Sequence, residues 1–197
     1  APIMKQIFQT NFYWKFQAPN AQQFIDKLNS VPNKDDEYTW GDACKIERTK
    51  LNWKEYAPYL TPSINIVKKN FETEMSFILA SPWLNFYNKG FFQEVHDHAG
   101  NDLSCVFFLN DGPDFSKFYF WDRNLIQTTE AWGQAMGFTS AMYPEIKAGD
   151  IIFFPSYLCH GVTPHNSDVT RKTFAANMVM IPKEGKVSLE QAVKHGA

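Results

Sequence analysis

Two histidines, His96 and His98, stand one residue apart at the end of the aromatic stretch FFQEVHDHAG (residues 91–100). In a β-strand, residues i and i+2 point to the same face, so both imidazoles project together while Asp97 faces the opposite side. Two imidazoles on one face can occupy neighbouring positions on a divalent metal, because histidine is a common ligand for iron, zinc and nickel. The pair alone is compatible with a metal site, with a polar network inside a core, or with an exposed strand end of no chemical interest, and the rest of the chain has to decide.

A third histidine and an arginine follow further along the chain. His160 lies in GDIIFFPSYLCHGVTPH, directly after an apolar run that is typical of a buried strand. Arg171 and Thr173 alternate in VTRKTFAANMVM and therefore share a face. An arginine beside a hydroxyl is a good receptor for a carboxylate, through a charge-assisted and often bidentate contact. Taken singly, Arg171 would fit a surface ion pair better.

The elements that must position these residues are mostly strands. From residue 75 onward, short aromatic or β-branched runs alternate with Gly, Pro, Asn and Asp turns. The runs are MSFILA, WLNFYN, FFQEVH, LSCVFFLN, KFYFWD, DIIFFP and KTFAANMVMI. So many strands in about a hundred residues predict a sandwich or a barrel.

Helices are expected on either side of this region. The stretch IFQTNFYWKF (7–16) predicts a strand, and AQQFIDKLNSV then places its apolar residues on one helical face. A second helix is predicted over 61–72, with Thr61 as the N-cap and Pro62 at the first helical position. A last helix is predicted over SLEQAVKH (188–195). We expect the earlier helices to pack against one face of the sheet.

The composition indicates one folded domain over residues 1–197, with the strand-rich core at about 75–181. The net charge is −2 and the sequence has no block of basic residues, so it offers no positively charged surface for nucleic acid or an anionic membrane. The chain shows no apolar run near the ~20 residues that span a bilayer, and no signal-peptide core. Its three cysteines do not form a disulfide pattern. We therefore expect a cytoplasmic protein, monomer or homodimer, that binds neither nucleic acid nor membrane.

The order of His-x-His, Phe-Pro-x₄-His and Arg-x-Thr on one strand-rich chain resembles the Fe(II)- and 2-oxoglutarate-dependent oxygenases. The resemblance runs from about Trp83 to Met180, roughly half the chain. Its most specific part is AGDIIFFPSYLCHGVTP (148–164), which is similar to the family's Gly-Asp, Phe-Pro, His, Val-x-Pro segment. The subgroup it resembles most is that of small prolyl-4-hydroxylase-like members, often from phage or bacteria, in which His-x-His precedes a Ser-initiated aromatic strand.

The resemblance implies a fold and a set of roles. The fold is a double-stranded β-helix (a cupin-like jelly roll), with the metal at its open mouth and helices packed on one sheet. His160 matches the distal iron histidine, and the segment before His96 is similar to the one that leads into the first iron histidine. Arg171 and Thr173 match the pair that holds the far carboxylate of 2-oxoglutarate. Further contacts to this cosubstrate are expected from Gln93 and Tyr87.

The sequence departs from the family at the second residue of the metal motif. Most members bind iron through His-x-Asp/Glu and the distal histidine, whereas here His98 occupies the carboxylate position. We favour an all-histidine set of His96, His98 and His160. A carboxylate from Asp122 or Asp102 could instead join two of the histidines, or His98 could orient substrate or a ligand without binding the metal. Loss of the carboxylate would also fit a halide-accepting or an inactive relative.

We therefore expect an oxygenase that uses Fe(II) and 2-oxoglutarate, hydroxylates a small molecule or peptide residue, and releases succinate and CO₂. One alternative is a cupin-type metal enzyme that does not use 2-oxoglutarate, in which Arg171 would bind substrate or be structural. Another is a non-catalytic barrel module with a degenerate site. The connection 123–145 is expected either as a loop over the site or as an exposed insertion. The residues expected to line the barrel are Phe107, Phe153 or Phe154, and Phe174.

Overall fold

The computed structural model describes residues 11–32, 37–80, 82–123 and 130–183, with the backbone alone for 37–39. The strands are β1 (Trp14–Gln17), β2 (Glu37–Thr39), β3 (Cys44–Lys50), β4 (Met75–Leu79), β5 (Trp83–Tyr87), β6 (Phe92–His96), β7 (Leu103–Phe108), β8 (Phe118–Trp121), β9 (Ala141–Met142), β10 (Asp150–Pro155), β11 (His160–Val162) and β12 (Arg171–Pro182). The helices are α1 (Ala21–Asn29), α2 (Trp53–Lys68) and α3 (Glu130–Met136), with a short 3₁₀ turn, η1 (Gly41–Ala43).

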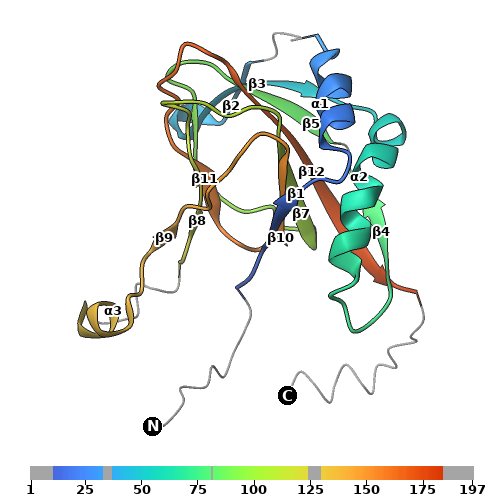
Figure 1. Cartoon of the computed structure of the whole chain (residues 1–197). Coiled ribbons are helices and arrows are strands. Elements are labelled where there is room, and N and C mark those ends of the chain that lie inside the picture. The colour runs from blue at the N-terminus through green and yellow to red at the C-terminus, as the bar shows by residue number, and fades with distance from the viewer. Residues whose placement is uncertain (1–10, 33–36, 81, 124–129, 184–197) are drawn as a thin grey trace.

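The strands form one curled antiparallel sheet. Its order is β1-β10-β7-β12-β5-β3-β6-β11-β8-β9, with β2 paired to β3 and β4 paired to β12. The sheet folds over so that β11 and β8 lie on one side of the barrel and β7, β10 and β12 on the other (Figure 1). This is the expected double-stranded β-helix, and the N-terminal strands β1 and β3 complete it.

The two long helices cover the outer face of the larger side of the barrel. Phe24 of α1 stacks on Phe107 at 4.7 Å between ring centroids and meets Phe174 edge-on at 5.0 Å. Phe107, Phe153 and Phe174 all belong to this helix-facing core, so the expectation that they line the barrel interior is wrong. Successive strand residues face opposite sides, and it is their neighbours on the inner face that enclose the interior.

A second core fills the interior of the barrel. Its buried apolar residues include Phe108, Phe118, Phe154 and Val162, contributed by four different strands. Phe154, the alternative to Phe153, lies against the ring of His160 at 4.8 Å between centroids. Phe108, Phe118 and Val162 of this inner core also line the pocket described below.

The second helix begins earlier in the chain than the sequence predicts. Helix α1 is confirmed, but α2 begins at Trp53, where the Asn52 side chain accepts a hydrogen bond from the Lys54 backbone N–H at 3.0 Å. Thr61 and Pro62 therefore lie inside the helix, and the Thr61 hydroxyl donates to the Ala57 carbonyl one turn earlier at 2.8 Å. The predicted helix over 188–195 and residues 7–10 of the predicted first strand lie outside the described residues.

Helix α3 stands apart from the barrel (Figure 1). Its Trp132 and Met136, with Phe138 just after it, are exposed. No helix in the described part of the chain combines the length and apolarity needed to cross a bilayer.

Candidate active site

Three histidine side chains converge at one mouth of the barrel. His96 ends β6, His98 follows it by two residues, and His160 begins β11 directly opposite His96. One ligand nitrogen from each lies within 4.8 Å of the others, and Nε2 of His98 is 3.1 Å from Nε2 of His160. A metal bound by imidazole at about 2.1 Å requires neighbouring nitrogens about 3 Å apart. The cluster therefore has nearly the spacing that one ion needs.

Backbone carbonyls fix two of the three rings. Nδ1 of His96 is 2.7 Å from the Glu94 carbonyl, and Nδ1 of His160 is 3.0 Å from the Leu158 carbonyl. A carbonyl only accepts, so each Nδ1 carries the proton and donates it. Nε2 of both rings then carries a lone pair and no proton, as a metal ligand requires.

Burial keeps the cluster neutral. Desolvation lowers the pKa of His96, lowers that of His98 to about 4, and holds that of His160 well below its ordinary range. The neighbouring imidazoles lower the pKa of His98 and His160 further, because each disfavours a second positive charge. At neutral pH the three rings are neutral, as metal binding requires.

The acidic side chains near this cluster are engaged elsewhere. Asp97 pairs with Arg123 at 2.7 Å, as expected for a side chain that faces away from its histidine neighbours. The Asp102 carboxylate accepts a hydrogen bond from the Met180 N–H at 2.8 Å. Asp122 lines a different pocket. Among the described residues, the group that could hold a metal consists of histidines only.

One pocket inside the barrel joins the histidines to the residues predicted to bind 2-oxoglutarate. Arg171 and Thr173 come from β12, Tyr87 from β5, and Gln93 from β6, and all four line it. The described part of 123–145 contributes no residue to this pocket, so the structure does not bear out a loop over the site.

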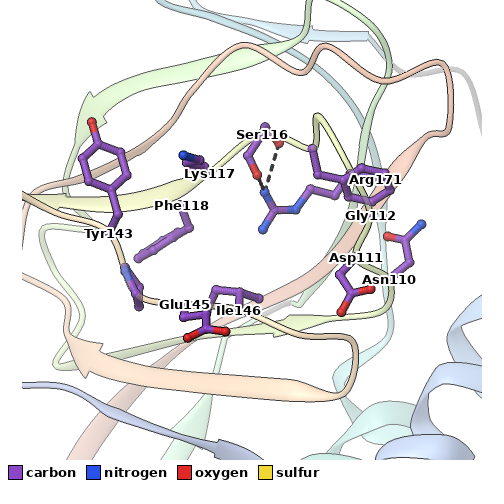
Figure 2. Close-up of a pocket in the computed structure, with 12 residues that line it drawn as sticks. Asn110, Asp111, Gly112, Ser116, Lys117, Phe118, Tyr143, Glu145, Ile146 and Arg171 are labelled. Carbon is purple, nitrogen blue, oxygen red and sulfur yellow. Dashed lines mark hydrogen bonds between the residues drawn. The ribbon is translucent and has the colours of Figure 1, made fainter.

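Arg171 is the buried cation of this pocket. Its side chain is 4% exposed and its guanidinium lies 5.0 Å above the Phe108 ring. Nη1 donates to the carbonyl and to the hydroxyl of Ser116, while Nε has no partner (Figure 2). No carboxylate of the described residues lies within ion-pair distance, and burial lowers the pKa of Arg171 to about 10. A buried, unpaired guanidinium is costly unless an anion joins it.

Polar side chains surround this guanidinium. The Asn85 amide donates to the Thr173 hydroxyl at 3.2 Å, and Thr173 also hydrogen-bonds Tyr87. The Tyr87 hydroxyl donates to Gln93, and burial raises the pKa of Tyr87 well above its usual range. All of these groups are neutral, so Arg171 sets the charge of this end of the pocket.

A second cavity of about 350 Å³ adjoins the first at this end, and Figure 2 shows residues that line it. Arg171 and Phe118 line both cavities, and Lys117, Tyr143 and Glu145 line the second alone. The Arg171 guanidinium therefore lies between two cavities.

Sequence reasoning missed several residues of the site. Ser116, which holds Arg171, sits in a loop with no periodic signal. Asn177, which contacts the His98 ring at 3.0 Å, could have been found because strand alternation places it on the same face as Arg171 and Thr173. Trp83, whose ring lies over His98 at 6.0 Å, also shows only in the fold.

Comparison with known proteins gives a family and a fold. Residues 81–177 match the model of a family described as "Putative 2OG-Fe(II) oxygenase". A comparison with the curated proteins finds no significant match.

Several solved structures share the fold. A Pseudomonas putida prolyl-4-hydroxylase is 15% identical, with a TM-score of 0.58 over 86% of this chain and 94% of that one. A 2OG-Fe(II) oxygenase family protein from Burkholderia pseudomallei is 12% identical, with a TM-score of 0.62 over 85% and 84%. HygX from Streptomyces hygroscopicus, crystallised with nickel and 2-oxoglutarate, is 12% identical, with a TM-score of 0.60 over 88% and 84%.

The family match spans about half of the chain. It contains all three histidines of the cluster, together with Arg171 and Thr173. The shared fold extends over most of the rest. The chain therefore belongs to the 2-oxoglutarate- and Fe(II)-dependent oxygenases.

Proposed function

We propose that this protein is a hydroxylase that holds Fe(II) through His96, His98 and His160. In this proposal Arg171 and Thr173 bind the far carboxylate of 2-oxoglutarate, with Tyr87 and Gln93 beside them. When bound, iron and 2-oxoglutarate would supply the oxidising chemistry with O₂ as the oxidant: one oxygen atom enters the succinate that forms with CO₂ from 2-oxoglutarate, and the other hydroxylates the substrate.

The observation that carries the proposal is the buried, unpaired guanidinium of Arg171 in the same pocket as three neutral imidazoles. One end of the pocket suits a divalent metal, and the other end lacks an anion. A small dicarboxylate that touches the metal with one end and Arg171 with the other satisfies both needs. Charge-assisted, often bidentate contacts of this kind are the strong contacts of arginine.

The histidine set fits an iron site in its donor chemistry. Imidazole is a good ligand for iron, and three such nitrogens on one side of an ion leave the opposite positions for cosubstrate and oxygen. His96 and His160 are already in the required tautomer, with Nε2 free. The all-imidazole set contributes no negative charge, so we expect weaker metal binding than with the usual carboxylate.

The chain's own residues would then orient reactants and exclude water. Phe108, Phe118 and Val162 form an apolar wall between the two polar ends of the pocket. Trp40 meets the His96 ring edge-on at 5.2 Å, and Trp83 covers His98. We propose a substrate with an apolar body, either a peptide residue or a small molecule, that approaches past these tryptophans.

An anaerobic titration tests the proposal. Fe(II) and then 2-oxoglutarate are added to metal-free protein, and the visible charge-transfer band of the chelate is followed in the parent, His98→Ala and Arg171→Met. Lys172→Met is the control, because Lys172 is the next residue on β12 and its ammonium instead hydrogen-bonds Asn29 at 3.2 Å.

We expect the charge-transfer band in the parent and in Lys172→Met. In Arg171→Met we expect it only at much higher concentrations of 2-oxoglutarate. Fe(II) binding without any band would refute the use of 2-oxoglutarate and favour a cupin-type metal enzyme. Failure to bind Fe(II) at all would favour a non-catalytic barrel module.

A further inference from the structure

A chain of buried hydrogen bonds runs behind His98 and ends on its ring. Nδ2 of Asn177 lies 3.0 Å from Nδ1 of His98, and Oδ1 of Asn177 accepts from the Ser104 hydroxyl at 2.8 Å. Ser104 in turn shares a 2.7 Å hydrogen bond with the Ser156 hydroxyl. Ser104 and Ser156 are at most 2% exposed and Asn177 is 9% exposed, so water does not compete for these groups.

Three neighbouring strands build this chain. Asn177 on β12 pairs in register with Ser104 on β7, and Ser156 directly follows β10, the other neighbour of β7. The Ser156 carbonyl also accepts the backbone N–H of His98 at 3.0 Å. His98 is therefore held at its backbone by one end of the chain and at its ring by the other.

His98 differs from the other two histidines in what it meets at Nδ1. His96 and His160 each meet a carbonyl, which can only accept, so their Nε2 atoms are always free of protons. His98 meets a side-chain amide, which presents either an N–H or an oxygen. In the present arrangement the amide N–H donates to Nδ1, so the proton of neutral His98 stands on Nε2 and points to the Nε2 lone pair of His160.

This tautomer cannot bind a metal through Nε2. The ligand tautomer carries its proton on Nδ1 and needs an acceptor there, which Asn177 supplies if its amide turns over. Both hydroxyls of the chain can donate or accept, so Ser104 and Ser156 can reverse their hydrogen bonds without moving an oxygen. The chain then has two hydrogen-bonding patterns, one for each tautomer of His98.

We propose that Asn177 is a positioning residue that selects the tautomer of His98, with its amide nitrogen toward the ring in the metal-free protein and its amide oxygen toward the ring once a metal is bound. The inference rests on the proposed function in one respect, that His98 is a metal ligand. The histidine that stands in place of the family's carboxylate thus has a supporting residue of its own.

Two substitutions of Asn177 separate this role from simple packing. Asn177→Asp retains the shape but offers only acceptors to the ring, so it fixes the proton on Nδ1 with or without metal. Asn177→Leu retains the volume and offers nothing. Asn101→Ala is the matched control, because the Asn101 amide donates to the backbone carbonyl of His98 at 3.4 Å and not to its ring.

The experiment uses the whole 197-residue chain with ¹⁵N-labelled histidine at pH 8 and Zn(II) as a diamagnetic probe. Long-range ¹H–¹⁵N spectra give the tautomer of His98, and competition with a chromophoric chelator gives the Zn(II) affinity. We expect the parent to change from Nε2–H to Nδ1–H when Zn(II) binds, and Asn177→Asp to show Nδ1–H already in the metal-free state. Asn177→Leu should bind Zn(II) roughly 10- to 100-fold more weakly, the usual effect of losing a residue that supports a metal ligand. Asn101→Ala should match the parent in both measurements.

Three results would overturn the inference: an unchanged His98 tautomer when Zn(II) binds to the parent, Nε2–H in metal-free Asn177→Asp, or parent-like Zn(II) affinity in Asn177→Leu. Should Asn177→Leu fail to fold, the tautomer of Asn177→Asp still decides. None of these measurements uses 2-oxoglutarate, so a missing charge-transfer band would refute the proposed function and leave this inference standing.

Discussion

Replacing Arg171 by methionine should weaken cosubstrate binding and leave the stability of the ligand-free protein nearly unchanged. Methionine has a similar length and is apolar, so it fills the space over the Phe108 ring without carrying a charge. An ordinary surface arginine would give no such effect, because its charge is already solvated.

The effect on binding follows from burial. Truncating one partner of a buried, hydrogen-bonded charge pair costs about 2–5 kcal/mol. At 1.4 kcal/mol for each factor of ten, the 2-oxoglutarate affinity should fall roughly 30-fold to several thousand-fold. The smaller decrease in affinity applies if Thr173 and Tyr87 still bind the carboxylate without Arg171.

The effect on the stability of the ligand-free protein should be small, because two contributions oppose each other. Burial lowers the Arg171 pKa from 12.5 to about 10, which corresponds to about 3 kcal/mol against the charged form. Each hydrogen bond from the charged guanidinium to Ser116 stabilises the folded protein by about 1.5–3 kcal/mol. The variant loses these hydrogen bonds. These contributions nearly cancel, so the free energy of unfolding of Arg171→Met should stay within about 1 kcal/mol of the parent.

Urea denaturation of metal-free protein measures the stability, and the anaerobic titration measures the affinity. With Fe(II) present, 2-oxoglutarate should also raise the melting temperature of the parent and of Lys172→Met but not that of Arg171→Met, because a ligand stabilises only the state it binds. A ligand-free loss of stability well above 1 kcal/mol with unchanged affinity would show that Arg171 is structural and that the charge argument is wrong.

Three further predictions concern the metal cluster and the core. His98→Ala should weaken Fe(II) binding by more than the 10- to 100-fold typical of a supporting residue, whereas His98→Asp should retain tight binding; equal loss in both variants would count against a ligand at this position. The metal-free protein should lose stability as the pH falls from about 6.5, the pKa of histidine in the unfolded chain, toward about 4, the folded-state pKa of His98. Over that range the unfolded state binds a proton at this residue and the folded state does not. Urea midpoints that do not fall between pH 8 and pH 5 would contradict this. Phe174→Ala should cost about 3–5 kcal/mol by leaving a cavity beneath the helices, so a loss below about 1 kcal/mol in a urea titration would show that this core is not tightly packed.

The strands were predictable because their signal is local. Short aromatic or β-branched runs between turn residues identified β4, β5, β6, β7, β8, β10 and β12 from sequence. The strand β3, CKIERTK, was missed because its outward residues are charged and few apolar residues mark its inner face. The start of α2 was missed because Thr61 and Pro62 imitate a helix beginning, whereas burial of Tyr56 and Leu60 continues the helix back to Trp53.

The site was predictable where residue type and chain order carry the information. The His-x-His pair, His160 and the Arg171–Thr173 pair meet in one pocket, as their order implied. The contacts between side chains distant in sequence were not predictable. Ser116 reaches Arg171 and Ser156 reaches Ser104 only because the barrel closes, and neither serine differs in sequence from an ordinary turn residue.

A histidine at position 98 affects the whole proposed site, because the negative charge that neutralises the metal would come from the cosubstrate and not from the protein. With a carboxylate ligand, the protein itself would neutralise part of the metal's charge; with three neutral rings it neutralises none. In the proposed site, the first anionic contact to the metal would then be the cosubstrate, and its other end would meet Arg171, whose Nε has no hydrogen-bond partner. Metal and cosubstrate must therefore strengthen each other's binding, and this coupling is reciprocal by thermodynamic necessity. It follows that Arg171→Met should leave Fe(II) affinity unchanged when the metal is added alone and reduce it when 2-oxoglutarate is present. A reduction in the absence of 2-oxoglutarate would mean that Arg171 acts on the histidines through the fold and not through the cosubstrate.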